Sequence, residues 1–492
     1  MRETLEDQLR RVTRNFTAPL GEEATLALAR DLLRELERAH AETPARHPDL
    51  SLASVVVADG RPVLDGGSPD GTAAEDLFRL GALLCSLASG RPADVSWRLD
   101  GPPEPPGSTV ARRALLAALA SPRRERRFAT AAEAIAATEV ALAPAATAPW
   151  PLFRGDPGRQ GAAPGAPVAS LQPLWTADIG ASVASPLVAA GVVLAATTDG
   201  RLVWLDPASG RLLHALKLAS AIESSPALAG TSVLLGTDDG ECLAVDAAAG
   251  SVLWRARLGQ VVRSSPLPIG DRVIVGVIEA KGAGGLVALD AKGKPVWKAR
   301  LQAVFSSCAL AGSRVLVGSD DGSLHAVDID KGSVAWSSAL GGKVRATPAV
   351  AGDTAYAGDF GGRMSALGLA DGARRWAAEL GAPLYSSPCI AEGLLVVGAN
   401  DGVIHGLDRA SGAARFQARA RGPVVASPVC RGDSFVVGST DGDLYLLDGK
   451  GEVRSHPTLD PRGVASSAAV EGDRLFVGSA RGVHALRIEP RT

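Results

Sequence analysis

Charged and aromatic residues recur at one position of a phrase that the C-terminal part of the sequence repeats. The phrase is Ser-Ser-Pro or a close variant, and the position lies three residues before the proline. Five successive copies carry there Glu223, Arg263, Phe305, Arg345 and Tyr385. Arginine pairs with carboxylates, and arginine and aromatic side chains are typical of binding hot spots. The pattern predicts a site for a protein or peptide partner, or for a small acidic ligand.

Other residues that could do chemistry are dispersed. His325, His405 and His484 share one repeat position, which Tyr445 also occupies, but each belongs to a different copy. A metal site needs three or four ligands that converge on one ion, so we expect no metal. The five cysteines are widely spaced and never form a Cys-x-x-Cys pair, which is typical of free buried thiols in a reducing compartment.

The copies follow one another at a fixed period. The aligned position recurs every 40 residues, with a single interval of 42. The residues at this position are Pro186, Pro226, Pro266, Cys308, Pro348, Pro388, Pro428 and Ala468. Each copy alternates apolar and polar residues in short runs between Gly and Asp turns, which indicates four antiparallel strands. A four-stranded repeat of about 40 residues is typical of a propeller blade, so the sequence predicts an all-β propeller with eight blades.

The eighth copy stops before its fourth, aromatic strand. A strand of that type, LQPLWTADIG around Trp175, stands directly before the first copy. We expect this strand to complete the last blade and close the ring, which removes open sheet edges. The first strand of each blade would then line a central channel. The five candidate residues, which vary while the neighbouring serines barely do, would lie at a channel mouth.

These phrases, together with the lead-in WPLFRGDPGRQG, resemble the eight-bladed repeats of the pyrroloquinoline-quinone (PQQ) type. The resemblance covers residues 150–492 and extends to quinoprotein dehydrogenases and to an outer-membrane assembly scaffold. It implies the propeller fold, with a PQQ-dependent oxidoreductase as one possible function. Those enzymes hold the quinone with a disulfide between adjacent cysteines and a calcium cage. No two cysteines are adjacent in this sequence, so we expect no cofactor.

Residues 1–142 lack this period and have the amphipathic spacing of helices. The stretch HPDLSLASVVVADGRPVLDGG resembles the catalytic and metal-binding loops of a bacterial Ser/Thr protein kinase, with Asp49 and Asp65 at the two aspartates. Ser51 replaces the lysine of the family and Ser54 its metal-binding asparagine. Because phosphoryl transfer needs these groups and a phosphate-binding lobe, we interpret Asp49 and Asp65 as non-catalytic remnants of a degenerate C-lobe. A kinase whose N-lobe start is missing is the alternative.

The amino-acid composition bears on the kind of partner and on the cellular location. The 51 Lys and Arg nearly balance the 53 Asp and Glu, so no strong charge favours nucleic acid or a membrane as partner. The N-terminus has no apolar signal region, which predicts a cytoplasmic protein. An Ala/Pro/Gly-rich linker at residues 143–170 would join the mainly α domain to the propeller at residues 171–492. We expect this multidomain protein to be a non-catalytic scaffold, adaptor or ligand sensor.

Overall fold

The computed structural model describes residues 55–58, 61–64, 150–189 and 191–491. The described N-terminal residues form one hairpin, in which β1 (Val55–Ala58) pairs antiparallel with β2 (Arg61–Leu64). The rest of the predicted domain, including Asp49 and Asp65, lies outside the described residues, so its helical, kinase-like fold stays a prediction. Within the described residues, no helix has the length and apolarity that crossing a bilayer requires.

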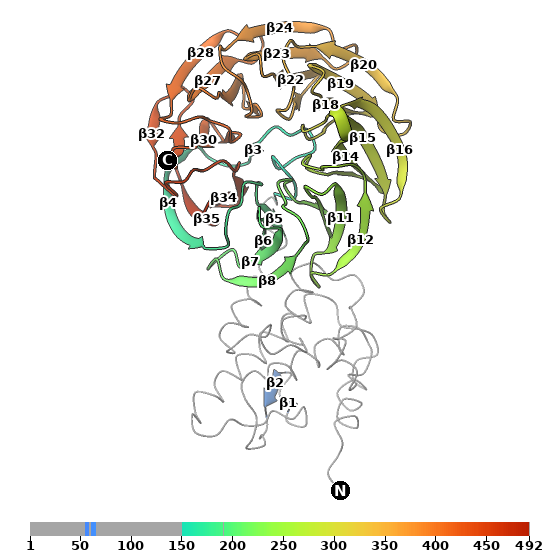
Figure 1. Cartoon of the computed structure of the whole chain (residues 1–492). Helices are drawn as coiled ribbons and strands as arrows, with labels where there is room; N and C mark the ends of the chain where they lie inside the picture. Colours follow the sequence, from blue (N-terminus) through green and yellow to red (C-terminus); the bar gives the residue numbers. More distant parts are fainter. Residues whose placement is uncertain (1–54, 59–60, 65–149, 190, 492) are drawn as a thin grey trace. The chain divides into compact units, whose positions relative to one another are not determined.

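The C-terminal part is an all-β propeller of eight blades arranged in a ring (Figure 1), which confirms the repeat-based prediction. The strands of each blade are given from the innermost outward. Blade one consists of β5 (Leu187–Ala189), β6 (Val192–Ala196), β7 (Arg201–Leu205) and β8 (Leu212–Lys217), and blade two of β9 (Ala227–Ala229), β10 (Ser232–Gly236), β11 (Glu241–Asp246) and β12 (Val252–Arg257). Blade three consists of β13 (Leu267–Ile269), β14 (Arg272–Ile278), β15 (Ala283–Asp290) and β16 (Pro295–Gln302), and blade four of β17 (Ala309–Ala311), β18 (Arg314–Gly318), β19 (Ser323–Asp328) and β20 (Val334–Ala339). A short 3-10 helix (Ala280–Gly282) connects β14 to β15.

The remaining blades follow the same order. Blade five consists of β21 (Ala349–Ala351), β22 (Thr354–Gly358), β23 (Arg363–Gly368) and β24 (Arg374–Glu379), and blade six of β25 (Cys389–Ile390), β26 (Leu394–Gly398), β27 (Val403–Asp408) and β28 (Ala414–Arg419). Blade seven contains β29 (Val429–Arg431), β30 (Ser434–Gly438), β31 (Leu444–Leu447) and β32 (Val453–Ser455), and blade eight contains β33 (Ala469–Glu471), β34 (Arg474–Gly478) and β35 (Val483–Pro490). The middle strands are almost wholly buried because apolar side chains from adjacent blades pack between the sheets.

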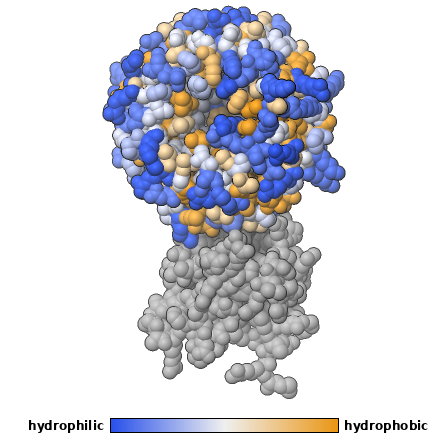
Figure 2. Space-filling view, viewed as in Figure 1, coloured by the Kyte–Doolittle hydropathy of each residue, from blue (hydrophilic) through white to orange (hydrophobic). Residues whose placement is uncertain are grey.

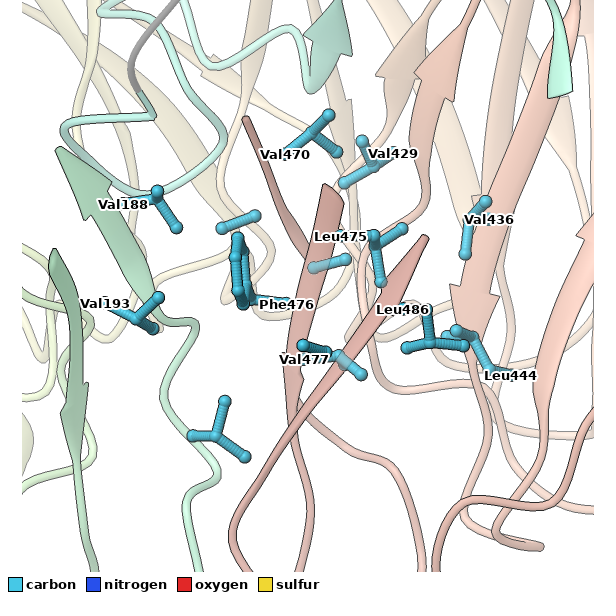
Figure 3. Close-up of a cluster of buried hydrophobic side chains, with 14 of the residues drawn as sticks. Val188, Val193, Val429, Val436, Leu444, Val470, Leu475, Phe476, Val477 and Leu486 are labelled. Atoms are coloured by element: carbon cyan, nitrogen blue, oxygen red, sulfur yellow. The ribbon is translucent and has the colours of Figure 1, made fainter. Parts of the chain in front are cut away.

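The fourth strand of the last blade comes from before the first repeat. β4 (Val168–Ala177) pairs antiparallel with β35, and Trp175 lies opposite Ala485. Val168, Leu171 and Ala177 of this strand are buried in an apolar cluster that also contains side chains of blades one, seven and eight. Figure 3 shows part of this cluster between the neighbouring sheets. The strand pairing that the sequence predicts for ring closure is present in the structure.

Tryptophans of the outer strands attach five of the eight blades to the next blade. Trp336 of blade four donates its indole N–H to the carbonyl of Leu369 in blade five at 3.0 Å. Trp376 of blade five donates to the carbonyl of Arg409 in blade six at 3.1 Å. The same bond to the following blade is made by Trp175, Trp254 and Trp297. The 40-residue period therefore reflects a contact that successive blades share.

A side chain at Gly412 is expected to disrupt one of these contacts. The φ of Gly412 is +74°, and a Cβ there would lie 2.5 Å from Cε3 of Trp376. We expect Gly412→Ala to lower the free energy of unfolding by roughly 2–5 kcal/mol, because backbone strain adds to overpacking. Urea denaturation measures this loss. The control is Gly352→Ala, since Gly352 has a φ of +61° with no atom within 4 Å of the new Cβ; equal losses in both variants would argue against the tryptophan contact.

The second serine of the repeated phrase links neighbouring blades. The backbone N–H of Ser225 donates to Oγ of Ser265 at 3.1 Å, and the N–H of Ser265 donates to Oγ of Ser307 at 2.9 Å. Seven such bonds of 2.8 to 3.1 Å connect the hydroxyl ring, which consists of Ser185, Ser225, Ser265, Ser307, Thr347, Ser387, Ser427 and Ser467. A buried N–H without an acceptor costs about 1–3 kcal/mol, which explains why every copy has a hydroxyl residue here.

The lead-in residues 150–161, which we call the channel segment, lie against the inner ends of the blades. The N–H groups of Leu310 and Val350 donate to carbonyl oxygens of this segment, both at 2.8 Å. Four other innermost strands make the same contact through Val188, Leu228, Ile390 and Cys430. β3 (Ala162–Ala163) then pairs in parallel with β29. In Figure 1 this part of the chain crosses the centre of the ring in teal.

Two arginines anchor the channel segment. The side chains of Arg154 and Arg159 are fully buried among the blades. Arg154 donates to carbonyl oxygens of blades six and seven, and Arg159 to those of blades three and four, at 2.7 to 3.3 Å. The accepting carbonyls belong to the residues that align the repeats, namely Pro266, Cys308, Pro388 and Pro428.

The prediction of a free linker over residues 143–170 is therefore wrong for its described part. A high Ala, Pro and Gly content indicates flexibility only where no side chain docks, and here Trp150 pairs with Val188 while the two arginines bind the blades. Residues 143–149 lie outside the described residues. The propeller thus begins by residue 150, before the predicted boundary at residue 171.

Candidate functional site

The five candidate residues stand shortly before the innermost strands of blades two to six, in a region that we call the rim. Each precedes its hydroxyl-ring residue by two positions. The turn between the second and third strands folds back to the same place, since the N–H of Asp238 donates to the carbonyl of Ala221 and that of Asp320 to the carbonyl of Ala303, both at 3.0 Å. A blade can therefore place two variable side chains at the rim, one before the innermost strand and one in this turn.

Arg263 is held by two carboxylates. Its Nε and Nη2 donate to the two carboxylate oxygens of Asp238 at 3.0 and 2.7 Å, and its Nη1 lies 3.0 Å from Glu223. The hydrogen bond that Arg263 donates to Asp238 raises the pKa of Arg263. Burial raises the pKa of Glu223, and the positive charge of Arg263 opposes that shift. The predicted residues Glu223 and Arg263 therefore form one ion-pair group across blades two and three.

Arg345 is paired in the same way and also contacts two aromatic rings. Its Nε and Nη2 donate to the carboxylate of Asp320, both at 2.8 Å, and Lys343 approaches the same carboxylate at 3.2 Å. Its guanidinium carbon lies 3.9 Å from the ring centre of Phe305 and 5.4 Å from that of Phe360, which are cation–π distances. Burial favours a raised pKa for Asp320, but the hydrogen bonds from Arg345 and Lys343 lower that pKa on balance.

Tyr385 extends this group to blade six. Its ring centre lies 4.2 Å from that of Phe360, with the planes inclined by 44°. The side chain is 45% exposed, whereas Phe305, Arg345 and Phe360 are half-buried. We call Phe305, Arg345, Phe360 and Tyr385 the aromatic cluster. It joins three of the five predicted residues on blades four to six.

The pairing changes the chemistry that the sequence predicts for the rim. Both arginines already have bidentate carboxylate partners, so an acidic ligand would have to displace Asp238 or Asp320. The charges of these two groups cancel, with Glu223, Asp238 and Asp320 set against Arg263, Lys343 and Arg345. The partner or acidic ligand that the sequence predicts for the rim therefore stays a prediction, and an acidic ligand would compete with these aspartates for the arginines.

Three further rim residues were not predicted from the sequence. Asp238, Asp320 and Phe360 stand two positions before the turn glycine, where other copies have Thr198, Asn400 and Thr440. Variation at one position of a regular repeat identifies the first five candidates, and the same signal is present at this second position. Applied to both positions, it would have found all eight residues.

The histidines that share a repeat position stay in separate blades. His325 contacts Asp321 at 2.9 Å and Ser337 at 2.7 Å, whereas His484 contacts Ser479 and Thr176. Burial lowers the pKa of His405 and of His484. In the part of the chain that the structure describes, no group of three or more His, Cys, Asp or Glu side chains converges as metal ligands would.

The described residues do not fit the quinone site that a PQQ enzyme requires. Cys242, Cys308, Cys389 and Cys430 are buried free thiols, and no two of them are adjacent in the chain. Burial raises the pKa of Cys242 and of Cys308 to about 12, so neither is a thiolate at neutral pH. A calcium cage also needs clustered oxygen ligands, and the described residues hold no such cluster of carboxylates.

Comparison with known proteins agrees with the propeller fold. Residues 168–282, 270–389 and 380–490 match the family model of outer membrane protein assembly factor BamB. BamB from Moraxella catarrhalis is similar with a TM-score of 0.58 and 21% identity, over 65% of this chain and 100% of that chain. Quinohemoprotein alcohol dehydrogenase from Comamonas testosteroni is similar with a TM-score of 0.61 and 14% identity, over 72% and 82% of the two chains.

The computationally designed protein Ika8 is similar to the same extent, with a TM-score of 0.58 and 16% identity over 65% of this chain and 100% of that chain. No curated protein matches the chain. An assembly factor, a dehydrogenase and a designed protein thus share this fold, and at such identities the similarity shows the fold alone. The family match begins at residue 168, so the kinase-like prediction for residues 1–142 stays a prediction.

Proposed function

Because the chain belongs to the family of outer membrane protein assembly factor BamB, we propose that it is a non-catalytic scaffold whose propeller binds a protein partner at the rim. BamB is named for a part in assembling other proteins, which is a task of binding. The described residues offer no converging metal ligands, and burial raises the pKa of the Cys242 and Cys308 thiols to about 12. Binding is therefore the activity that their chemistry supports best.

The aromatic cluster carries this proposal. Its four residues come from three blades, and Tyr385 exposes nearly half of its surface while its ring packs against that of Phe360. Rigid aromatic and arginine side chains that are already held in place lose little entropy on binding, which is typical of protein hot spots. Figure 2 shows apolar residues in scattered patches among hydrophilic ones on the face in view, which favours recognition by a local cluster.

The kind of partner follows from the charges. Both rim arginines are neutralised by aspartates, so a strongly acidic peptide gains little there. A protein segment with apolar or aromatic side chains can instead pack on Tyr385 and Phe305 without displacing an ion pair. We propose such a segment as the ligand of the rim.

The double variant Phe305→Ala with Tyr385→Ala tests the rim. We expect it to lose the partner, with binding weakened at least about tenfold, because truncation of a hot-spot residue costs about 2 kcal/mol or more. The measurement is affinity purification from the native host with quantitative mass spectrometry, followed by titration of the purified partner.

Val183→Ala is the matched control, since Val183 holds the same repeat position in blade one and is 38% exposed. A protein that the wild type and this control retain equally, and that the double variant loses, meets the expectation. Equal retention by all three chains would refute the rim as the binding surface.

The N-terminal part enters the proposal with less detail. We propose that residues 1–142 are a pseudokinase-like domain, in which Asp49 and Asp65 are remnants of catalytic loops, and that the protein works in the cytoplasm. The substitutions Ser51 and Ser54 support the loss of catalysis.

A further inference from the structure

Two thiols lie in the interface between blades six and seven. Cys389 is on β25 of blade six and Cys430 is on β29 of blade seven, and Cα atoms of these two innermost strands come within 8 Å of each other. Both side chains belong to one buried apolar cluster. The other described cysteines, Cys242 and Cys308, belong to blades two and four. Among the described residues, two cysteines therefore meet only in this interface.

The contacts of the two thiols bring their sulfur atoms together. Sγ of Cys389 lies 3.4 Å from the carbonyl oxygen of Gly161, and that same oxygen accepts the backbone N–H of Cys430 at 2.9 Å. Sγ of Cys430 lies 3.5 Å from the carbonyl oxygen of Ile390, which directly follows Cys389. The thiols are also hydrogen-bonded to each other. The sulfur atoms of such a pair need only a small approach to reach the disulfide length of about 2 Å.

The same interface has no indole bond to fasten it. At the position where Trp336 and Trp376 donate to the next blade, blade six carries Phe416, whose ring has no N–H. Phe416 packs against the cluster that contains both thiols. A covalent bond between Cys389 and Cys430 supplies the link to blade seven that the phenylalanine cannot make.

We propose that Cys389 and Cys430 form a disulfide that joins blades six and seven when the chain folds in the presence of a disulfide oxidant of the glutathione type. The bond forms before the blades close, because both side chains are buried in the folded chain. In a reducing compartment the pair stays as two thiols. The proposal does not depend on the proposed partner at the rim.

The chemistry is two steps of thiol–disulfide exchange. The thiolate of one cysteine attacks a sulfur of oxidised glutathione, which forms a mixed disulfide and expels one glutathione thiolate. The thiolate of the other cysteine then attacks the cysteine sulfur of the mixed disulfide and expels the second glutathione thiolate. The two cysteines are oxidised, one glutathione disulfide is reduced to two thiols, and the two cysteine protons pass to these thiols.

Cell-free synthesis of the full chain tests whether the bond forms. One sample is made with a mixture of reduced and oxidised glutathione, and the other with reduced glutathione alone. The folded fraction of each is alkylated in denaturant and mapped as peptides without reduction. We expect a cross-linked peptide containing Cys389 and Cys430 in the oxidised sample only, while Cys242 and Cys308 are alkylated in both. The proposal fails if this peptide is absent, or if the five cysteines of the chain pair at random.

Urea denaturation of the same samples measures the link between the blades. The bond closes the loop of residues 390–429, so we expect the unfolding equilibrium constant of the oxidised chain to be lower by roughly 30- to 900-fold, the range of a typical disulfide. Dithiothreitol should abolish the difference. Cys389→Ala should remove both the cross-linked peptide and the difference, whereas Cys242→Ala, at an equally buried cysteine of blade two, should keep both. Equal stability of the oxidised and reduced wild type would overturn the link.

Discussion

Replacing β4 by a Gly/Ser linker of equal length lowers the melting temperature of the propeller by about 10 °C or more. The replacement removes Val168 and Leu171 from the core that joins blades one, seven and eight, and each buried side chain of this size contributes about 1.5–3 kcal/mol. It also leaves β35, which pairs with β4 from Val483 to Pro490, as an open edge. A loss of 1 kcal/mol lowers the midpoint by about 2–4 °C in domains of 150–250 residues. Differential scanning calorimetry measures the change.

The same replacement of β20 is the control. This outer strand of blade four has only exposed and half-buried side chains, and its loss leaves the ring closed. We expect a clearly smaller decrease in the melting temperature. An unchanged melt after loss of β4 would show that the ring does not depend on this closure, and equal decreases for both strands would mean that closure adds nothing to the loss of an edge.

The repeat predicts the propeller because the same contacts between neighbouring blades recur along the chain. The hydroxyl ring and the tryptophan bonds to the next blade both repeat with the blades, so both leave a periodic trace in the sequence. The partner of Trp175 is predictable for the same reason, because the eighth copy lacks the one strand that stands before the first. Features that every blade shares can thus be found from a single sequence.

Features that occur once are not predictable in this way. Residues 150–161 occur outside the repeat, and their composition indicates a linker. Their docking depends on Arg154 and Arg159, whose acceptors are carbonyl oxygens. A carbonyl is present at every residue and leaves no mark in the sequence. The docking of the channel segment is for that reason the largest difference between the prediction and the structure.

The rim lies between these two cases. Its positions follow the repeat, so Arg263 and Arg345 are found, but their partners Asp238 and Asp320 stand 25 residues earlier, in the preceding blade. Only the packing of one blade on the next shows that each arginine is neutralised. The repeat therefore identifies the rim positions, whereas the ion pairs at these positions follow only from the packing of the blades, and binding at the rim stays a prediction.

Arg154→Ala is expected to lower the free energy of unfolding by at least about 4 kcal/mol. The variant removes the donors of four carbonyl oxygens, those of Arg159, Gln160, Pro388 and Pro428. A buried acceptor left unpaired costs about 1–3 kcal/mol, and the lost methylene groups add a cavity. The loss also leaves the channel segment attached to blades six and seven mainly through the backbone hydrogen bonds from Ile390 and Cys430. Guanidinium chloride denaturation at pH 7 measures it.

Arg154→Lys separates the hydrogen bonds from the charge. An ammonium keeps the charge but has three donors at one point instead of a planar fork, so it cannot reach all four carbonyls. We expect a loss between that of the alanine variant and zero. Arg257→Ala, at an exposed position of β12, controls for the removal of an arginine and should change stability by no more than about 0.5 kcal/mol. If Arg154→Ala is as stable as this control, the hydrogen bonds of Arg154 do not stabilise the propeller. The arginine would then be buried without holding the blades together.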